Sequence, residues 1–113
     1  MIKVSIFLTR RPDLTREQFT QYWHDKHASL VMSLDSFTSS IRRYAQQHCL
    51  NDVPAGFPIL PYDGVAEVWF DNLSSAITAF AHQDYASVVV RDEENFLDRT
   101  KTVMFLSSEE RMV

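Results

Sequence analysis

Residues 64–80, GVAEVWFDNLSSAITAF, contain a strand followed at once by a helix, and this pair indicates how the rest of the chain is organised. Its first seven residues are rich in β-branched and aromatic side chains, which favours a strand. Asp71 or Asn72 can cap the helix that follows. Apolar residues then recur at helical spacing at Leu73, Ala76, Ile77 and Phe80. The stretch predicts a β-α unit in the second half of the chain.

A similar unit occupies the first half of the chain. Residues 2–8 alternate along a strand whose two faces are both fairly apolar. Thr15 and Gln18 have the spacing of a capping box, which predicts that a helix begins at Thr15. Apolar residues follow at Phe19, Tyr22, Trp23, Leu30 and Leu34. We therefore expect an amphipathic helix over about residues 15–32.

Two more strands complete the predicted sheet. Residues 39–49 lack helical periodicity, and residues 100–107 close the chain as the last strand. Residues 51–61 hold three prolines and a glycine and form the main loop, while residues 84–98 are irregular and partly helical. The order β-α-β-β-α-β predicts a single α+β domain over residues 1–113. This is a ferredoxin-like fold with an antiparallel sheet and both helices on one face.

The sheet face opposite the helices is predicted to be apolar. Its candidate residues are Phe7, Val103, Phe105 and, depending on register, Val68 and Phe70. Large exposed apolar patches are rare on monomers, so we expect two copies to pack face to face as a homodimer. A monomer whose loops fold over this face is the alternative.

Composition excludes several classes of protein. The net charge is −4 and the only basic pairs are Arg10–Arg11 and Arg42–Arg43, so a nucleic-acid partner is not expected. No apolar run is long enough to span a membrane, and the apolar N-terminus fits a strand better than a signal peptide. The lone cysteine, Cys49, excludes an internal disulfide. We expect a cytoplasmic location.

Three short segments resemble the EthD family of the dimeric α/β barrel superfamily. Residues 19–28, FTQYWHDKHA, are similar to the family's opening helix, in which a His follows a Tyr-Trp pair four positions after the Trp. Trp23 and His27 match that motif. Residues 63–70, DGVAEVWF, resemble the central strand, and residues 92–98, DEENFLD, resemble the late acidic segment.

The resemblance implies a ferredoxin-like domain that dimerises through its sheets and holds a pocket between helices and sheet. The family was first linked to ethyl tert-butyl ether degradation. Similar proteins include polyketide-modifying enzymes and a methylmuconolactone isomerase that need no metal or organic cofactor. A mechanism that uses a thiol elsewhere than Cys49 would be absent here.

Two residues are candidates for acid–base catalysis. His27 lies at the edge of the apolar helix stripe, where an imidazole can exchange a proton with a bound enol or carboxylate. The structural alternative is a helix-end histidine that packs on the core and bonds a backbone carbonyl. Glu67 lies inside the central strand, where it either lines the pocket or forms a salt bridge to Arg42 or Arg43.

Aromatic side chains are candidates for the pocket wall. Those expected to bind ligand are Trp23, Tyr44, Trp69, Phe80, Tyr85 and Phe96, with core packing as the alternative role of each. His24, Asp25 and Lys26 are expected on the solvated helix surface, as is the acidic run 92–94. No third ligand accompanies His24 and His27, so no metal site is expected.

The sequence leads to one function and two alternatives. The leading hypothesis is a cofactor-independent isomerase, dehydratase or decarboxylase acting on a small hydrophobic, aromatic or lactone-like metabolite. The second is a non-catalytic binding or accessory protein that supports an oxygenase or a degradation pathway. The third is a structural dimer without a pocket.

Overall fold

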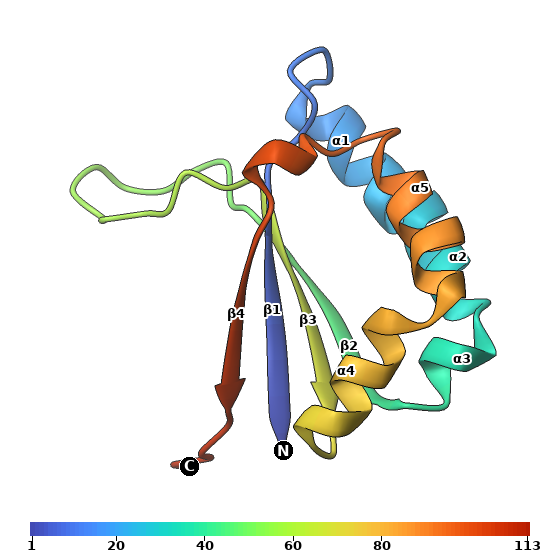
Figure 1. Cartoon of the computed structure of the whole chain (residues 1–113). Helices are drawn as coiled ribbons and strands as arrows, with labels where there is room; N and C mark the ends of the chain where they lie inside the picture. Colours follow the sequence, from blue (N-terminus) through green and yellow to red (C-terminus); the bar gives the residue numbers. More distant parts are fainter.

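A computed structural model describes all residues from Met1 to Val113 (Figure 1). The larger elements follow one another in the predicted order β-α-β-β-α-β. The strands are β1 (Ile2–Leu8), β2 (Ile41–His48), β3 (Gly64–Phe70) and β4 (Val103–Ser108). The helical segments are α1 (Arg16–Tyr22), η1 (Trp23–His27), α2 (Ala28–Met32), α3 (Asp35–Thr38), α4 (Leu73–Ala81), η2 (Tyr85–Val90), α5 (Arg91–Glu93) and η3 (Arg99–Lys101).

The four strands form one antiparallel sheet in the order β2-β3-β1-β4. The register places Val4 opposite Val68 on β3 and opposite Leu106 on β4. The helices α1 to α5 lie on one side of the sheet, and the loop between β2 and β3 extends away from it (Figure 1). The predicted α+β, ferredoxin-like arrangement is confirmed.

The helices over the sheet form two runs, and the first is continuous from α1 through η1 to α2. It begins at Thr15, where the predicted capping box with Gln18 is present. Its middle segment, η1, is a π-helical turn in which the backbone N–H of Ala28 donates to the carbonyl of Trp23, five residues back. Such turns are rare in proteins, and those that occur often lie at functional sites.

The π turn changes which residues the helix buries. An α-helix advances about 100° per residue, so side chains four apart drift by about 40° at each step. The wider turn offsets this drift, and Phe19, Trp23, His27 and Val31 are all buried on one face. Leu30, which α-helical spacing assigned to the apolar stripe, is therefore exposed.

The second helical run also has a π-helical part, but it is interrupted after α4 (Leu73–Ala81), where the backbone of His82 is extended. The helix α4 begins at Asn72, whose side chain accepts a hydrogen bond from the backbone N–H of Ser75. It leads through the π-helical segment η2 into α5. The short helix α3, which the sequence did not predict, connects α2 to β2 and buries Phe37.

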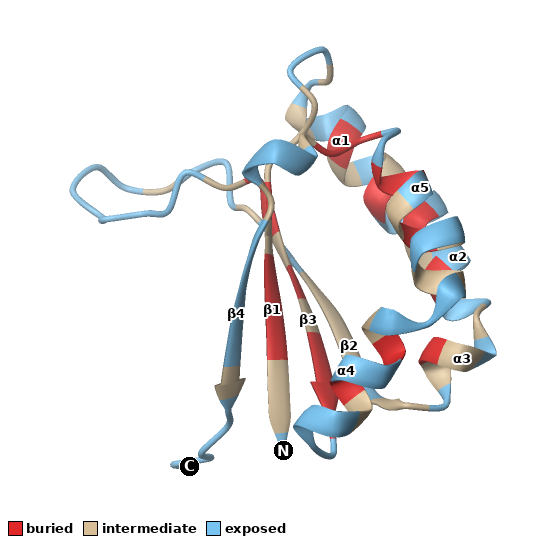
Figure 2. Cartoon of the chain, viewed as in Figure 1, coloured by how far each residue is buried: buried red, intermediate tan, exposed pale blue.

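The core lies between the helices and one face of the sheet (Figure 2). Val4, Ile6 and Leu8 of β1 point into it, together with Val68 and Phe70 of β3. The prediction that register could place Val68 and Phe70 on the opposite face is wrong. Strand residues alternate between faces, so the pairing of Val4 with Val68 fixes both on the helix side.

The opposite sheet face holds Phe7, Val103 and Phe105, as predicted, because paired strand residues share a face. Val103 and Phe105 are exposed. The same face also carries Glu67 and Trp69, so it is only partly apolar. No helix of the protein is long and apolar enough to cross a membrane.

Candidate functional site

A narrow apolar cavity of about 30 Å³ lies between the helical layer and the sheet. Thirteen of its fifteen lining residues are hydrophobic, so its two ionisable acid–base groups, His27 and Glu93, stand out. A water needs roughly 10–15 Å³ of such volume. The cavity as it stands therefore fits one or two waters, and a larger ligand requires side chains to move.

His27 is held in place by a buried carboxylate. Its Nδ1 atom lies 2.7 Å from Oδ2 of Asp92, and the imidazole is only 5% exposed. Asp92 also accepts hydrogen bonds from the hydroxyl of Tyr22 at 2.6 Å and from the amide of Asn95 at 3.1 Å. These bonds fix the carboxylate, which in turn fixes the imidazole ring.

The protonation states of this pair follow from their surroundings. Burial opposes ionisation of Asp92, but hydrogen bonds from Tyr22, His27 and Asn95 outweigh it and lower the pKa of the carboxyl group. Burial lowers the pKa of His27, partly offset by Asp92. A neutral imidazole beside an ionised carboxylate keeps its proton on Nδ1, where it donates to that carboxylate. Nε2 is then unprotonated and basic.

The Nε2 atom of His27 has no hydrogen-bond partner in the protein. Every fully buried side-chain nitrogen or oxygen does have a partner, so this atom keeps some accessible surface. His27 lines the cavity, and with Nδ1 bound to Asp92, Nε2 is the one ring nitrogen left for a molecule there. The imidazole can therefore accept a proton or hydrogen bond from a molecule bound there.

Glu93 is the second ionisable acid–base group of the cavity and is 8% exposed. Its carboxylate forms an ion pair with Arg99, but the Nε–Oε1 distance of 3.6 Å is too long for a hydrogen bond. Burial is the largest influence on Glu93 and raises its pKa to about 7. The charge of Arg99 acts in the opposite direction, and the charge of Asp92 adds to the rise. A substantial fraction of this group is protonated at neutral pH.

Aromatic rings form part of the cavity wall. The Phe80 and Tyr85 rings are half-buried and meet edge to face, with centroids 4.9 Å apart. Phe37 packs on both of them. Burial raises the pKa values of Tyr44 and Tyr85 above the ordinary phenol value, so both hydroxyls remain protonated at neutral pH.

The structure brings together most of the residues that the sequence singled out. The predicted site residues that line the cavity are Trp23, His27, Tyr44, Phe80, Tyr85 and Phe96. The exposed residues Asp25 and Lys26, as well as His24, lie on the helix surface as predicted.

Glu67 and Trp69 lie elsewhere. Both point from β3 to the sheet face opposite the helices, so they do not share a pocket with His27. Glu67 forms a salt bridge with Lys3 and accepts a hydrogen bond from Gln47 at 2.7 Å. The expected salt bridge to Arg42 or Arg43 is replaced by this one, because Lys3 is the nearer cation across the β1–β3 pair.

Arg42 and Arg43 have other partners. Arg42 forms a salt bridge with Asp71 at 2.7 Å. The guanidinium of Arg43 stacks over the Trp69 ring, 4.6 Å from its centroid. Trp69 thus makes cation–π contacts, and it does not line the apolar cavity where ligand binding was expected.

The sequence reading missed Asp92 and Glu93. Both were assigned to a solvated acidic run, but they are buried and only Glu94 of the run is exposed. Tyr85, Val89 and Glu93 line the cavity at intervals of four residues, which matches the spacing of Trp23, His27 and Val31 on the facing helix. This shared four-residue spacing, together with the EthD-like acidic segment, is the signal that could have identified Glu93.

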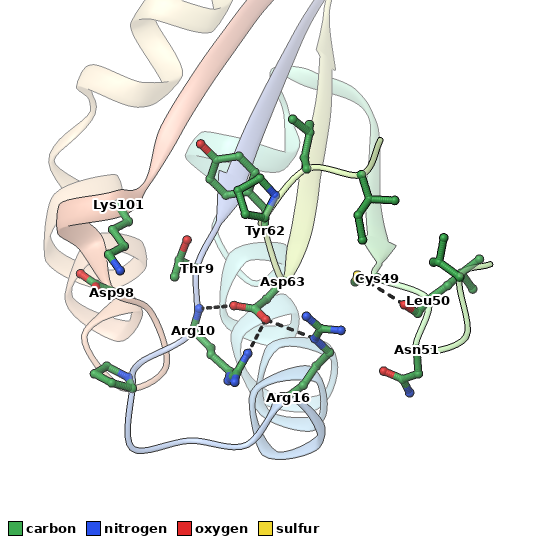
Figure 3. Close-up of a pocket in the computed structure, with 15 residues that line it drawn as sticks. Thr9, Arg10, Arg16, Cys49, Leu50, Asn51, Tyr62, Asp63, Asp98 and Lys101 are labelled. Atoms are coloured by element: carbon green, nitrogen blue, oxygen red, sulfur yellow. Dashed lines mark hydrogen bonds and ion pairs between the residues drawn. The ribbon is translucent and has the colours of Figure 1, made fainter. Parts of the chain in front are cut away.

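A second hollow of about 650 Å³ lies under the loop between β2 and β3 (Figure 3). At its base Asp63 accepts hydrogen bonds from the backbone and side chain of Arg10, and from Nε of Arg16 at 3.2 Å (Figure 3). These contacts lower the pKa of Asp63 despite its burial. The network joins β1, α1 and β3 and satisfies its own charges, so we assign it a structural role.

No group of three or more His, Cys, Asp or Glu side chains is arranged to hold a metal ion. The single cysteine, Cys49, is half-buried at the end of β2 and does not line the apolar cavity.

Several solved structures share this fold. An EthD-like protein from Ralstonia eutropha JMP134 has 18% sequence identity and a TM-score of 0.71, covering 98% of this chain and 95% of its own. An EthD family protein from Bacillus halodurans C-125 has 16% identity and a TM-score of 0.69, covering 97% and 100%. A dimeric protein of unknown function from Bacteroides fragilis NCTC 9343 has 14% identity and a TM-score of 0.68, covering 96% and 95%. At these identities the likeness concerns the fold alone.

Sequence comparison assigns the family. No curated protein matches the chain in sequence. The family model described as EthD domain matches residues 11–100, which include the helix with His27, the central strand and the acidic segment with Asp92 and Glu93. The chain belongs to the EthD family.

Proposed function

We propose that this protein is a cofactor-independent enzyme in which His27 acts as a general base on a small, hydrophobic metabolite bound between helices and sheet. The observation that carries the proposal is the His27–Asp92 pair. A carboxylate holds one imidazole nitrogen, the other has no protein partner, and the residue lines an apolar cavity. This is the arrangement that a positioned base requires.

The cavity limits the substrates and reactions that fit this proposal. Its lining favours a molecule whose surface is mostly apolar, such as an aromatic ketone or a lactone. A single base can remove a proton from the carbon next to a carbonyl group, and such a step begins isomerisations and dehydrations. Desolvation keeps the imidazole neutral, and therefore able to accept that proton.

Hydrogen–deuterium exchange tests the proposal. 2-Tetralone is a compact aromatic ketone whose α-protons are replaced by deuterium when a base removes them in D₂O, and proton NMR measures the rate. We expect the protein to accelerate this exchange and the His27→Asn variant to lose at least 100-fold of that acceleration. His24→Asn is the matched control, because His24 is exposed on the same helical segment.

The outcomes of this experiment separate the two functional classes. Exchange lost in the His27 variant and kept in the His24 variant supports the enzyme. No exchange above the uncatalysed rate, combined with a rise in melting temperature on adding 2-tetralone, would replace it with a non-catalytic binding protein. Equal exchange by the wild type and His27→Asn would place the base elsewhere.

We also propose that two copies associate through the open sheet face as a homodimer. The support comes from β4, whose residues Val103 and Phe105 lie on that face and are 47% and 61% exposed. An apolar strand of this kind is an unfavourable surface for a monomer. A structural neighbour of unknown function is described as dimeric with the same ferredoxin-like fold.

A further inference from the structure

Glu93 differs from the other buried carboxylates of the chain. Asp63 and Asp92 each accept three hydrogen bonds, which accounts for their burial. Glu93 is equally buried but receives no hydrogen bond, and Arg99 approaches it only to 3.6 Å. A carboxyl group placed for stability alone would be satisfied by donors in the same way. Glu93 is instead one of the residues that line the apolar cavity.

The position of Glu93 relative to His27 is fixed by its neighbour. Asp92 holds Nδ1 of His27, and Glu93 follows Asp92 directly in α5. Both His27 and Glu93 line the same narrow cavity, together with side chains that are almost all hydrophobic. A ligand that enters by moving these side chains therefore meets a wall that contains both groups.

We propose that Glu93 is the general acid that works with His27, and that the pair takes an uncharged ketone or lactone with an acidic C–H next to its carbonyl. The carboxyl group of Glu93 would donate its proton to the carbonyl oxygen, and Nε2 of His27 would remove the proton from carbon. This proposal rests on the proposed function of the cavity. A ligand carboxylate is disfavoured there, because it would meet the charge of Asp92 in apolar surroundings.

The step balances within the protein and its ligand. The C–H bond breaks and its electron pair becomes a carbon–carbon π bond. The carbonyl π pair then takes the proton of Glu93, so the ligand becomes a neutral enol beside an imidazolium and a carboxylate. The enol hydroxyl returns its proton to Glu93, while His27 delivers its proton to carbon. If the imidazolium first trades its proton for a deuteron from D₂O, delivery to the same carbon gives exchange. Delivery to the γ-carbon of an unsaturated ketone moves the double bond.

The environment of Glu93 suits this role. The charged or titratable groups around it are His27, Tyr44, Tyr85, Asp92 and Arg99. Their net effect with burial is a pKa near 7, so an acid that can release a proton is available at neutral pH.

Kinetics of 2-tetralone exchange distinguish a proton donor from a structural side chain. Glu93→Gln keeps a hydrogen-bond donor of similar shape but has no proton to transfer. We expect it to lower kcat for exchange by 10–100-fold and to leave KM within about threefold. Glu94→Gln is the control, because Glu94 is adjacent and exposed. If Glu93→Gln exchanges at the wild-type rate while His27→Asn does not, the role of Glu93 is overturned and the proposed function stands.

A second measurement does not depend on turnover. The infrared carbonyl stretch of bound, ¹³C-labelled 2-tetralone falls in frequency when a donor bonds its oxygen. We expect a lower frequency in the wild type than in Glu93→Leu, with Glu93→Gln close to the wild type. Circular dichroism checks that each variant is folded. An identical frequency in the wild type and Glu93→Leu would overturn the contact between Glu93 and the carbonyl group.

Discussion

Nδ1 of His27 lies 2.7 Å from Oδ2 of Asp92, although 65 positions of sequence separate the two residues. The helical run that contains His27 packs beside the run that contains Asp92. Each run has a π-helical turn at or next to the contact. The π turns shift both helices into a four-residue spacing on the cavity side. This contact is what turns a buried histidine into an oriented base.

Replacement of Asp92 by Asn tests whether the carboxylate orients that base. The amide group can donate to Nδ1, which would move the imidazole proton to Nε2 and remove the free base. We expect Asp92→Asn to slow 2-tetralone exchange by at least 100-fold, in line with the wrong-tautomer effect known for catalytic histidines. Circular dichroism should show an intact fold. Wild-type exchange in this variant would mean that Asp92 has no orienting role.

Gly64 permits the close approach of Trp23, which lines the cavity. A Cβ at position 64 would lie 2.6 Å and 2.9 Å from two ring carbons of Trp23, and that ring is fully buried. We expect Gly64→Ala to lower the free energy of unfolding by about 1–3 kcal/mol, measured by urea denaturation.

A double-mutant cycle isolates this contact. Trp23→Phe removes the ring atoms that the new Cβ would meet, so Gly64→Ala should cost clearly less free energy in that background. An equal cost in both backgrounds would attribute the loss at Gly64 to its backbone and not to Trp23.

The raised pKa of Glu93 predicts a pH dependence of stability. The folded protein keeps this proton up to about pH 7, whereas the unfolded chain releases it near 4.5. The unfolded state therefore binds fewer protons across that interval, and stability from Glu93 falls as pH rises through it. The shift corresponds to about 3 kcal/mol.

Glu93→Gln removes this contribution. We expect the variant to gain stability relative to the wild type between pH 5 and pH 8, by up to about 3 kcal/mol in chemical denaturation. The lowered pKa of His27 has the opposite effect, because its contribution to folding stability decreases as pH falls. Both proteins share this contribution, so it cancels in the comparison. A difference that stays constant with pH would show that Glu93 is ionised throughout.

The open sheet face predicts the oligomeric state. Light scattering on a sizing column should give the wild type twice the 13.1 kDa mass of one chain. Phe105 is 61% exposed on that face, so Phe105→Asp should reduce the mass to that of a monomer at micromolar concentration. Leu73→Asp is the control, because Leu73 is exposed at the start of α4. A monomeric wild type would contradict the proposed dimer.

Local patterns were sufficient to predict the fold. Alternation identified the first strand, and β-branched and aromatic content identified the third. Caps at Thr15 and Asn72 marked where the two main helices begin. These are short-range signals that each segment carries in its own residues. The choice between Val68 and Trp69 for the core face depends on pairing with β1, which is a long-range property.

The candidate site was predicted only in part, for a related reason. The position of His27 beside Trp23 was visible from helical spacing, but its partner Asp92 comes from the far end of the chain. The acidic run 92–94 has the composition of a solvated surface, and composition cannot reveal that two of its members face inward. Glu67 lies in the predicted strand, yet strand alternation directs it away from His27.

Nitrogen NMR of the His27 imidazole, with and without 2-tetralone, tests the central claim most directly. We predict a neutral ring at pH 7 with its proton on Nδ1, and a shift of the Nε2 signal when 2-tetralone is added, while the signals of exposed His24 stay unchanged. A proton on Nε2, or an Nε2 signal that does not respond to 2-tetralone, would contradict the account of His27 as an oriented base facing a ligand cavity.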